Sequence, residues 1–159
     1  MTARVLAIDP GYDRIGVALL ERDAFGRDVC LFSTCVQTDR KASHHERLFT
    51  TGNAVRKLIL EHEPTVFAIE KLFFQNNAKT AMVVAEARGI MLFLARVNNL
   101  EIHEYTPQEI KVAMTGHGGS DKKAVTDMVK RLVQGVPDKA LDDEYDAIAI
   151  GVTCLAHLR

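Results

Sequence analysis

The sequence predicts an α/β fold built on a mixed β-sheet. Apolar runs at residues 5–8 and 15–20 flank the turn-forming pair Pro10-Gly11, which indicates a β-hairpin. A third apolar run at residues 29–36 extends the hairpin into an antiparallel meander. Further along, a helix between two strands requires a right-handed crossover, which brings in a parallel strand. Both strand directions are therefore expected in one sheet.

Length and composition favour a single globular domain spanning residues 1–159. The chain is 47% hydrophobic and 26% charged, which is typical of globular proteins. It has no uninterrupted apolar stretch of the roughly 18–20 residues that cross a bilayer, and it begins without a secretory signal pattern. We therefore expect a cytoplasmic protein with no membrane partner. Because the net charge is −1, a nucleic-acid partner would require locally grouped basic residues.

The three cysteines are expected to be reduced. Cys30 and Cys35 lie five residues apart in one predicted strand, so their side chains should point to opposite faces and not form a disulfide. Cys154 lies in an apolar segment near the C-terminus. The absence of Cys-x-x-Cys and His-x-x-x-His spacings argues against a zinc site.

Two predicted strands end on carboxylates. The first strand, residues 5–8, is followed by Asp9, and the fourth, residues 66–69, is followed by Glu70. A buried carboxylate must be hydrogen-bonded, paired, or turned toward a metal or a cleft, because an isolated buried charge is unstable. A local alternative is that Asp9 only opens the turn at Pro10.

The segment between these two strands predicts a loop and a helix. Residues 39–46 are polar, and we expect the pair His44-His45 to lie in a solvated loop and to bind no ligand. Apolar residues then recur at helical spacing from Leu48 to His62, and Pro64 ends that helix.

The segment after the fourth strand predicts an aromatic loop and a long apolar helix. The loop carries Phe73 and Phe74, one of which could stack on a ligand. The helix, Ala78–Val97, is apolar on most sides, so it must be buried on more than one face. Its small residues form one stripe at Ala81, Ala85 and Gly89. Packing on its own sheet is one explanation, and we favour a dimer interface.

A strand at Glu101–Tyr105 and a short helix that carries Lys111 precede a glycine-rich loop. The loop lacks the Gly-x-x-x-x-Gly-Lys-Ser/Thr spacing of a nucleotide-binding P-loop. It contains His117, which could contact a phosphate or donate a proton, although loop histidines more often do neither.

The helix after this loop begins with two lysines, Lys122 and Lys123, and is capped by Ser120 or Asp121. Lysines in the first turn oppose the helix dipole, so an anionic partner would explain them; a solvated surface is the alternative. Its expected buried residues are Val125, Met128, Val129 and Leu132.

The last helix begins in a run of acids and continues as a small-residue apolar segment. Acids in a first turn are stabilised by the helix dipole, which by itself would explain Asp142 and Asp143. Asp146 lies beside the most apolar part of the helix and shares one face with Asp143.

Four carboxylates therefore stand at the ends of elements: Asp9, Glu70, Asp143 and Asp146. Clustered carboxylates repel one another and have raised pKa values unless cations are present. Hard oxygen ligands of this kind suit Mg²⁺ or Mn²⁺. Two such ions, about 3.5–4 Å apart, can activate a water and stabilise the leaving oxygen in phosphodiester cleavage.

The order and spacing of these motifs resemble the RuvC family of bacterial crossover junction endodeoxyribonucleases. The resemblance covers essentially the whole chain and rests on Ala-Ile-Asp9-Pro-Gly, Ala-Ile-Glu70-x-x-Phe73, Glu86-Ala-Arg-Gly89 and Asp143-x-x-Asp146-Ala-x-Ala. It implies a ribonuclease H-like fold, with a mixed five-stranded sheet flanked by helices. It also implies a homodimer, formed through the Ala78–Val97 helix, that nicks two strands of a four-way DNA junction symmetrically and leaves 5′-phosphate ends.

The resemblance also implies roles for single residues. The matching catalytic and metal-binding acids, which would hold two Mg²⁺ (or Mn²⁺) ions per active site, are Asp9, Glu70, Asp143 and Asp146. Lys122 matches a catalytic basic residue near the cleaved phosphate. The candidate DNA-binding residues are Phe73, Phe74, Lys79, Lys111, His117, Lys122 and Lys123. A branch-migration helicase complex is the expected further partner.

Three rival hypotheses share parts of the pattern. Actin-like ATPases and sugar kinases share the Asp-Pro-Gly hairpin but need a second, duplicated domain that 159 residues do not hold. An RNA-processing nuclease of the same fold would have similar acid spacing, but the Phe73 loop and the apolar helix would be unexpected. A non-catalytic junction-binding module would not need all four acids.

Overall fold

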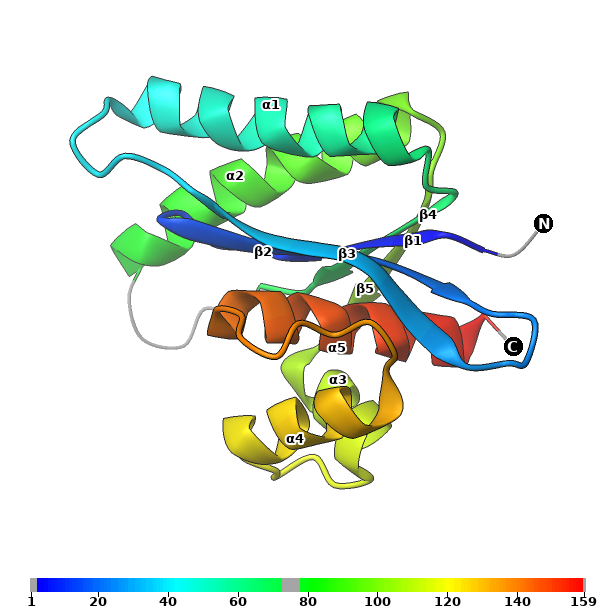
Figure 1. The fold of residues 1–159 in the computed structure, drawn as a ribbon. Coiled ribbons are helices and arrows are strands. Elements are labelled where there is room, and N and C mark those ends of the chain that lie inside the picture. The colour runs from blue at the N-terminus through cyan, green and yellow to red at the C-terminus, as the bar shows by residue number, and fades with distance from the viewer. Residues whose placement is uncertain (1–2, 73–77, 159) are drawn as a thin grey trace.

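The computed structural model describes residues 3–72 and 78–158 and shows a sheet between two helical layers (Figure 1). The described residues form the strands β1 (Val5–Asp9), β2 (Arg14–Arg22), β3 (Asp28–Gln37), β4 (Val66–Glu70) and β5 (Glu101–Tyr105). They also form the helices α1 (His44–His62), α2 (Ala78–Val97), α3 (Pro107–Thr115), α4 (Lys122–Leu132) and α5 (Asp142–His157). In Figure 1, α1 and α2 cover one face of the sheet, and α3, α4 and α5 lie on the other.

The sheet is mixed, as the sequence predicts. Its strand order is β3-β2-β1-β4-β5. The meander β1-β2-β3 is antiparallel, whereas β4 runs parallel to β1 on one side and to β5 on the other. Helix α1 carries the chain from the edge strand β3 to β4, which lies between β1 and β5. This arrangement confirms the predicted helix-flanked five-stranded fold.

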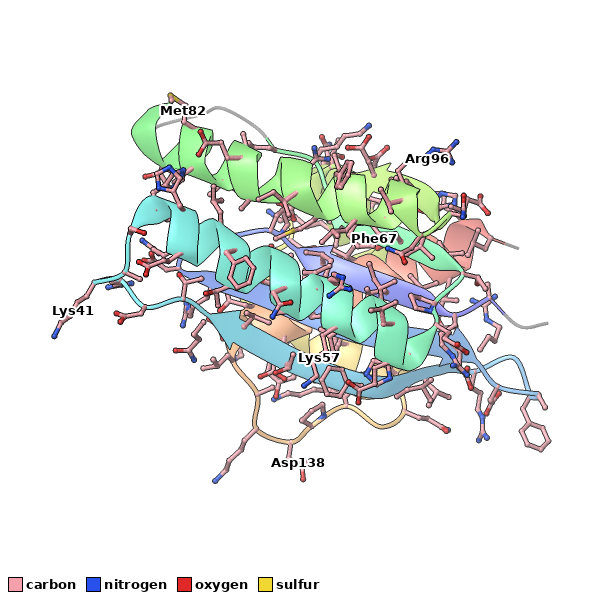
Figure 2. The ribbon with its side chains drawn as sticks, turned by 90° about the horizontal axis from the view of Figure 1, so that it is seen from above. Lys41, Lys57, Phe67, Met82, Arg96 and Asp138 are labelled. Carbon is pink, nitrogen blue, oxygen red and sulfur yellow. The ribbon has the colours of Figure 1, made fainter. Side chains whose placement is uncertain are left out.

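Strand β1 is buried on both of its faces. Leu6 and Ile8 belong to the core beneath α1 and α2, whereas Val5 and Ala7 belong to the core shared with α5. Phe67 of β4 is fully buried, and it lies beneath α2 in Figure 2. Burial on both faces explains why β1 and β4 read as continuous apolar runs and not as alternating patterns.

The prediction of a solvated loop over residues 39–46 is wrong for the last residues of that segment, which belong to α1. Ser43 caps α1: its hydroxyl accepts a hydrogen bond from the Glu46 amide (3.3 Å), and the Glu46 carboxylate accepts one from the Ser43 amide (2.8 Å). This reciprocal capping box stabilises the helix start, so His44 is the first helical residue. Its ring nitrogens lie 2.7 Å from the Tyr12 hydroxyl and 2.6 Å from a Glu86 carboxylate oxygen.

His44 therefore ties the loop between β1 and β2 to both α1 and α2. We expect His44→Ala to lower the free energy of unfolding by about 1 kcal/mol, because it removes two partly exposed hydrogen bonds. His45→Ala is the matched control, since His45 is exposed and forms no hydrogen bond within the described residues. Urea unfolding of both variants measures the difference; equal stability of the two would contradict this structural role.

The cysteine prediction is confirmed in one respect and wrong in another. Cys30, Cys35 and Cys154 are free thiols, as expected. However, Cys30 packs in the core shared with α5, and the Cys35 thiol also faces α5, 4.0 Å from Asp143 Oδ2. The pairing of β2 with β3 shifts register between Leu19 and Leu20. This bulge adds one residue to β3 between the cysteines and brings both to the same face.

Helix α4 differs from its predicted burial at one position. Asp121 is its cap and accepts a hydrogen bond from the Ala124 amide. Val125 and Val129 are buried as predicted, but Leu132 is 51% exposed. The helix ends at Leu132, and the extended residue that follows, Val133, fills the core in its place. Among the described helices, none is both long and apolar enough to cross a membrane.

Candidate active site

Three elements bring the four predicted acids to one edge of the sheet. Asp9 ends β1 and Glu70 ends β4, and these neighbouring strands run parallel, so both acids lie at the same edge. Asp143 and Asp146 lie in the first two turns of α5, which packs across β1 and β2. The structure therefore joins acids that are more than 130 residues apart in the sequence.

Gly16 permits the close approach of α5, and the sequence analysis missed it. It lies opposite Asp9 in the β1–β2 pair. A Cβ atom on Gly16 would stand 1.8 Å from the backbone oxygen of Asp143. Only glycine lets the start of α5 lie directly on β2 beside Asp9. The available signal was a glycine inside an apolar strand, which often marks a close backbone approach.

The pKa values of Asp9, Glu70 and Asp146 are raised, mainly by burial and by the negative charge of neighbouring acids. Burial, together with the charges of its acidic neighbours, raises the pKa of Asp9 to about 8. These neighbours, in decreasing order of effect, are Asp146, Glu70 and Asp143. Burial, followed by the charge of Asp146, raises the pKa of Glu70 to about 7. Burial also raises the pKa of Asp146, against the opposing influence of Lys122.

Cationic side chains hold the two aspartates of α5. The Lys122 ammonium lies 2.9 Å from Asp146 Oδ2 and 3.7 Å from Asp142 Oδ2. The Arg14 Nε atom lies 3.2 Å from Asp143 Oδ2. In contrast, the Asp9 and Glu70 carboxylates form no hydrogen bond or ion pair with any residue in the described ranges. The unpaired acids are thus the two at the strand ends.

The four carboxylates are suitable ligands for a divalent cation, although their side chains do not point toward one common position. No three His, Cys, Asp or Glu side chains within residues 3–72 and 78–158 form a ready-made metal cluster. Asp143 and Asp146 are turned toward Arg14 and Lys122 instead. Two half-buried carboxylates without partners are nevertheless unfavourable when ionised, and oxygen ligands of this kind suit Mg²⁺. A cation bound beside Asp9 would supply the missing charge.

A small cavity of about 200 Å³ opens beside these acids. Its charged wall consists of Glu70, Lys111, Lys122 and Asp146, and its apolar wall includes Ile110 and Val125. The positive charge of Lys111 lowers the pKa of Glu70 and partly offsets the effect of burial. The sequence-predicted basic residues Lys111 and Lys122 are therefore brought to the carboxylates.

The other predicted DNA contacts are not brought to the carboxylates. Lys123 is exposed at the start of α4 and does not line the cavity. The His117 ring accepts a hydrogen bond from the Gly119 amide (2.9 Å) and so orders its own loop. Phe73 and Phe74 lie outside the described residues. Lys79 is in the first turn of α2, and its side chain is also outside the described part of the chain.

The raised pKa values predict how stability depends on pH. The folded chain binds protons at Asp9 and Glu70 that the unfolded chain, with ordinary pKa values of 3.8 and 4.5, releases earlier. Without metal, stability should therefore fall as pH rises from about 4 to 8. Mg²⁺ should restore several degrees of melting temperature at pH 8.5 and little at pH 5.5, since it pairs with the ionised acids.

Melting temperatures in EDTA and in Mg²⁺, measured at pH 5.5, 7 and 8.5, test this prediction. A Mg²⁺ effect that is equal at all three values, or a metal-free protein that becomes more stable between pH 5.5 and 8.5, would contradict the electrostatic description of the site.

Comparisons with known proteins show the family of the chain. The family model described as crossover junction endodeoxyribonuclease RuvC matches residues 5–154. A relative of that name from Thermosipho melanesiensis is 38% identical over 154 residues, which cover 96% of each protein. Another from Mycolicibacterium smegmatis is 36% identical and covers 94% of this chain and 80% of the relative.

The solved structures give the same result for the fold. The Thermus thermophilus RuvC in complex with Holliday junction substrate superposes with a TM-score of 0.90 at 26% identity, covering 99% of this chain and 95% of that one. The yeast mitochondrial Holliday junction resolvase Ydc2 shares the fold at a TM-score of 0.73 and 13% identity, over 96% of this chain and 79% of that one. With a family model that spans nearly the whole sequence, the chain belongs to the RuvC family of crossover junction endodeoxyribonucleases.

Proposed function

We propose that this protein cleaves four-way DNA junctions, nicking two strands symmetrically and leaving 5′-phosphate ends. The observation that carries the proposal is the acidic edge of the sheet, where Asp9 and Glu70 lie unpaired beside the aspartates of α5. Relatives with 36–38% identity carry the name crossover junction endodeoxyribonuclease, and a structural neighbour holds a Holliday junction substrate. Family membership implies dependence on a divalent metal. Mg²⁺, with two ions per site, is the finer proposal.

The four carboxylates are the proposed metal ligands. Asp9, which feels the charges of the other three acids, would hold the metal together with Glu70, Asp143 and Asp146. When bound, the metal would supply an activated water and charge stabilisation at the scissile phosphate. Asp9 and Glu70 must be ionised to hold a metal ion. With pKa values of about 8 and about 7, they would ionise near neutral pH.

Lys122 and Lys111 supply positive charge to the cavity that Glu70 and Asp146 also line. Lys122 pairs with Asp146 in the absence of substrate and metal. With a metal held at Asp146, the Lys122 ammonium would be available to contact the scissile phosphate or its neighbour. Lys111 stands across the same cavity and is placed to contact the same anionic backbone. Both lysines would then stabilise the charge that develops during cleavage.

Paired nicks require two active sites, so we propose a homodimer formed through α2. Support comes from apolar side chains that α2 leaves exposed: Met82, Phe93 and Val97. Exposed apolar residues on one helix mark a surface for association. A branch-migration helicase complex in the cytoplasm is the proposed setting of the reaction.

The direct test is incubation of a mobile four-way DNA junction with the protein and Mg²⁺, alongside linear duplex of the same sequence and structured RNA. We expect paired nicks at symmetric positions on the junction, with ends that DNA ligase can seal. Binding without cleavage in both Mg²⁺ and Mn²⁺ would favour a non-catalytic junction-binding module. Preferential cleavage of RNA would favour an RNA-processing nuclease of the same fold.

A further inference from the structure

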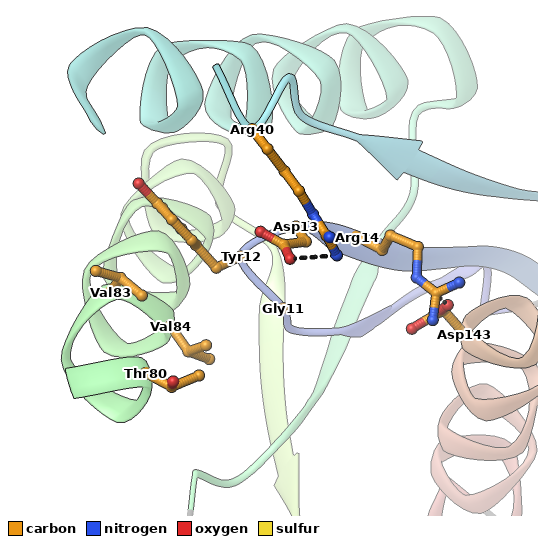
Figure 3. Close-up of a pocket in the computed structure, with 9 residues that line it drawn as sticks. All are labelled: Gly11, Tyr12, Asp13, Arg14, Arg40, Thr80, Val83, Val84 and Asp143. Carbon is orange, nitrogen blue, oxygen red and sulfur yellow. Dashed lines mark ion pairs between the residues drawn. The ribbon is translucent and has the colours of Figure 1, made fainter. Parts of the chain in front are cut away.

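A second, larger hollow lies on the other side of the catalytic acids. It has a volume of about 740 Å³ and is bounded by the loop between β1 and β2, the first turns of α2, and Asp143 (Figure 3). Val83 and Val84 form its apolar wall, and Arg14 and Arg40 bring positive charge. Neither the sequence motifs nor the cavity with Lys111 and Lys122 includes these two arginines.

Arg40 is surplus positive charge when the acids around the two arginines are counted. Asp13 already accepts an ion pair from the Arg47 guanidinium, which is largely buried. Arg40, whose side chain is 78% exposed, is a second cation on that single carboxylate, at 2.7 Å. Arg14 pairs with Asp143, and the proposed metal would take over that carboxylate. Figure 3 shows Arg40 directed toward Asp13 and Arg14 directed toward Asp143.

The wall that carries these charges is held in place. The Arg47 guanidinium stacks 3.7 Å above the Tyr12 ring and donates a hydrogen bond to the Tyr12 carbonyl. His44 bonds to the Tyr12 hydroxyl from the other side. The loop between β1 and β2 is therefore fixed by contacts to α1, so the hollow is preformed and its charges need little reordering to bind a ligand.

The position of the hollow indicates what it binds. The small cavity is lined by Glu70 at the end of β4, whereas the hollow is lined by Arg14 at the start of β2. Strand β1, which ends at Asp9, lies between β2 and β4 in the sheet. A nucleic-acid strand whose scissile phosphate sits at the carboxylates must continue in both directions. A phosphodiester backbone that leaves the small cavity across Asp9 enters the hollow next.

We propose that this hollow binds the DNA strand that continues beyond the scissile phosphate, with Arg14 and Arg40 contacting its phosphates. The inference rests on the proposed junction cleavage and adds a phosphate-binding subsite to it. Arg40 reaches the hollow from the loop before α1, so it contacts a phosphate farther from the acids than the one that Arg14 contacts. The contacts are electrostatic and independent of base sequence.

Salt-dependent binding of a four-way junction tests the subsite. In an Asp9→Asn background, used to prevent cleavage, the added change Arg40→Gln should weaken binding several-fold at about 150 mM salt. It should also reduce the slope of log K against log [salt] by about 0.7–0.9, the value for one lost phosphate contact. Arg14→Gln should have a smaller effect in this background, because Arg14 stays paired with Asp143 when the metal site is disabled. The matched control, Arg56→Gln on the exposed face of α1, should leave affinity and slope unchanged.

A second measurement locates the phosphates. We would prepare a set of junctions, each with one neutral methylphosphonate at a different position on either side of the mapped nick. The affinity of each junction is measured for the parent protein and for Arg40→Gln. We expect one position, on one side of the nick only, where neutralisation weakens the parent and leaves Arg40→Gln unaffected. The subsite is overturned if no such position exists, or if Arg40→Gln and Arg56→Gln have equal slopes. Failure of the parent protein to bind or cleave junctions would instead overturn the proposed function.

Discussion

Asp9→Asn is expected to abolish junction cleavage, lowering the rate by about 10³-fold or more, while binding of the junction persists. Asp9 lies at the centre of the acidic set, and its pKa is raised by all three of the other acids. An amide in its place keeps the shape of the side chain but removes one of the negative charges that would hold a metal ion. Loss of a ligand at the reacting centre removes transition-state stabilisation that no other group replaces.

The same substitution should not destabilise the metal-free protein. An ionised Asp9 is held among like charges in a half-buried position, so neutral Asn relieves repulsion. In EDTA at pH 8.5 we expect Asp9→Asn to melt at or above the temperature of the parent protein. Inactivity combined with undiminished stability separates a catalytic role from a structural one.

Asp127→Asn is the control, since Asp127 is exposed on α4 and away from the cavity. It should leave both cleavage and melting temperature unchanged. The assignment of Asp9 would be contradicted by an Asp9→Asn protein that cleaves within tenfold of the parent rate. It would equally be contradicted by a variant whose inactivity merely follows unfolding.

Gly16→Ala is expected to have the largest effect on folding of any single methyl group added to the site. The new Cβ would overlap the backbone oxygen of Asp143, which cannot rotate away as a side chain can. The start of α5 must therefore move off β2 and carry Asp143 and Asp146 with it. We expect a loss of roughly 3 kcal/mol in the free energy of unfolding, together with loss of Mg²⁺-dependent cleavage.

Gly151→Ala, on the α5 side of the same contact between the helix and the sheet, provides a graded comparison. Its Cβ would meet the end of the Leu20 side chain at 2.3 Å and the Ala7 Cβ at 3.2 Å. The Leu20 side chain can change rotamer, so the cost should be smaller, and the acids should keep their positions. Urea unfolding measures the stability of both variants, and junction-cleavage assays measure their activity. A Gly16→Ala protein at least as stable as Gly151→Ala would contradict the close contact between β2 and α5.

The elements that the sequence predicted well are those with a strong local pattern. Apolar runs that end in acids predicted β1 and β4 and placed Asp9 and Glu70 at the edge of the sheet. The start of α1 was also readable, since Ser43 and Glu46 have capping-box spacing, but the polar character of the segment concealed it. The capping-box spacing of Ser43 and Glu46 is thus a stronger local signal for a helix start than the polar composition around it is for a loop.

The features that sequence reasoning missed depend on distant residues. The ion pair between Arg14 and Asp143, and the contact of Gly16 with the same residue, join positions separated by more than 120 residues. The shared face of Cys30 and Cys35 depends on a β-bulge, which strict alternation along a strand does not reveal. Such pairings follow from the register of the sheet and the packing of α5 and cannot be read from spacing alone.

Cleavage of a supercoiled plasmid that extrudes a cruciform tests the central claim most directly. The four-way junction at its base offers two symmetric nick sites, and a dimer that nicks both strands within one binding event converts the circle to a linear product. In Mg²⁺ we expect the linear form to appear without accumulation of nicked circles, and with ends that ligase can seal. Nicked circles as the lasting product, or an intact plasmid in both Mg²⁺ and Mn²⁺, would contradict paired, metal-dependent junction cleavage.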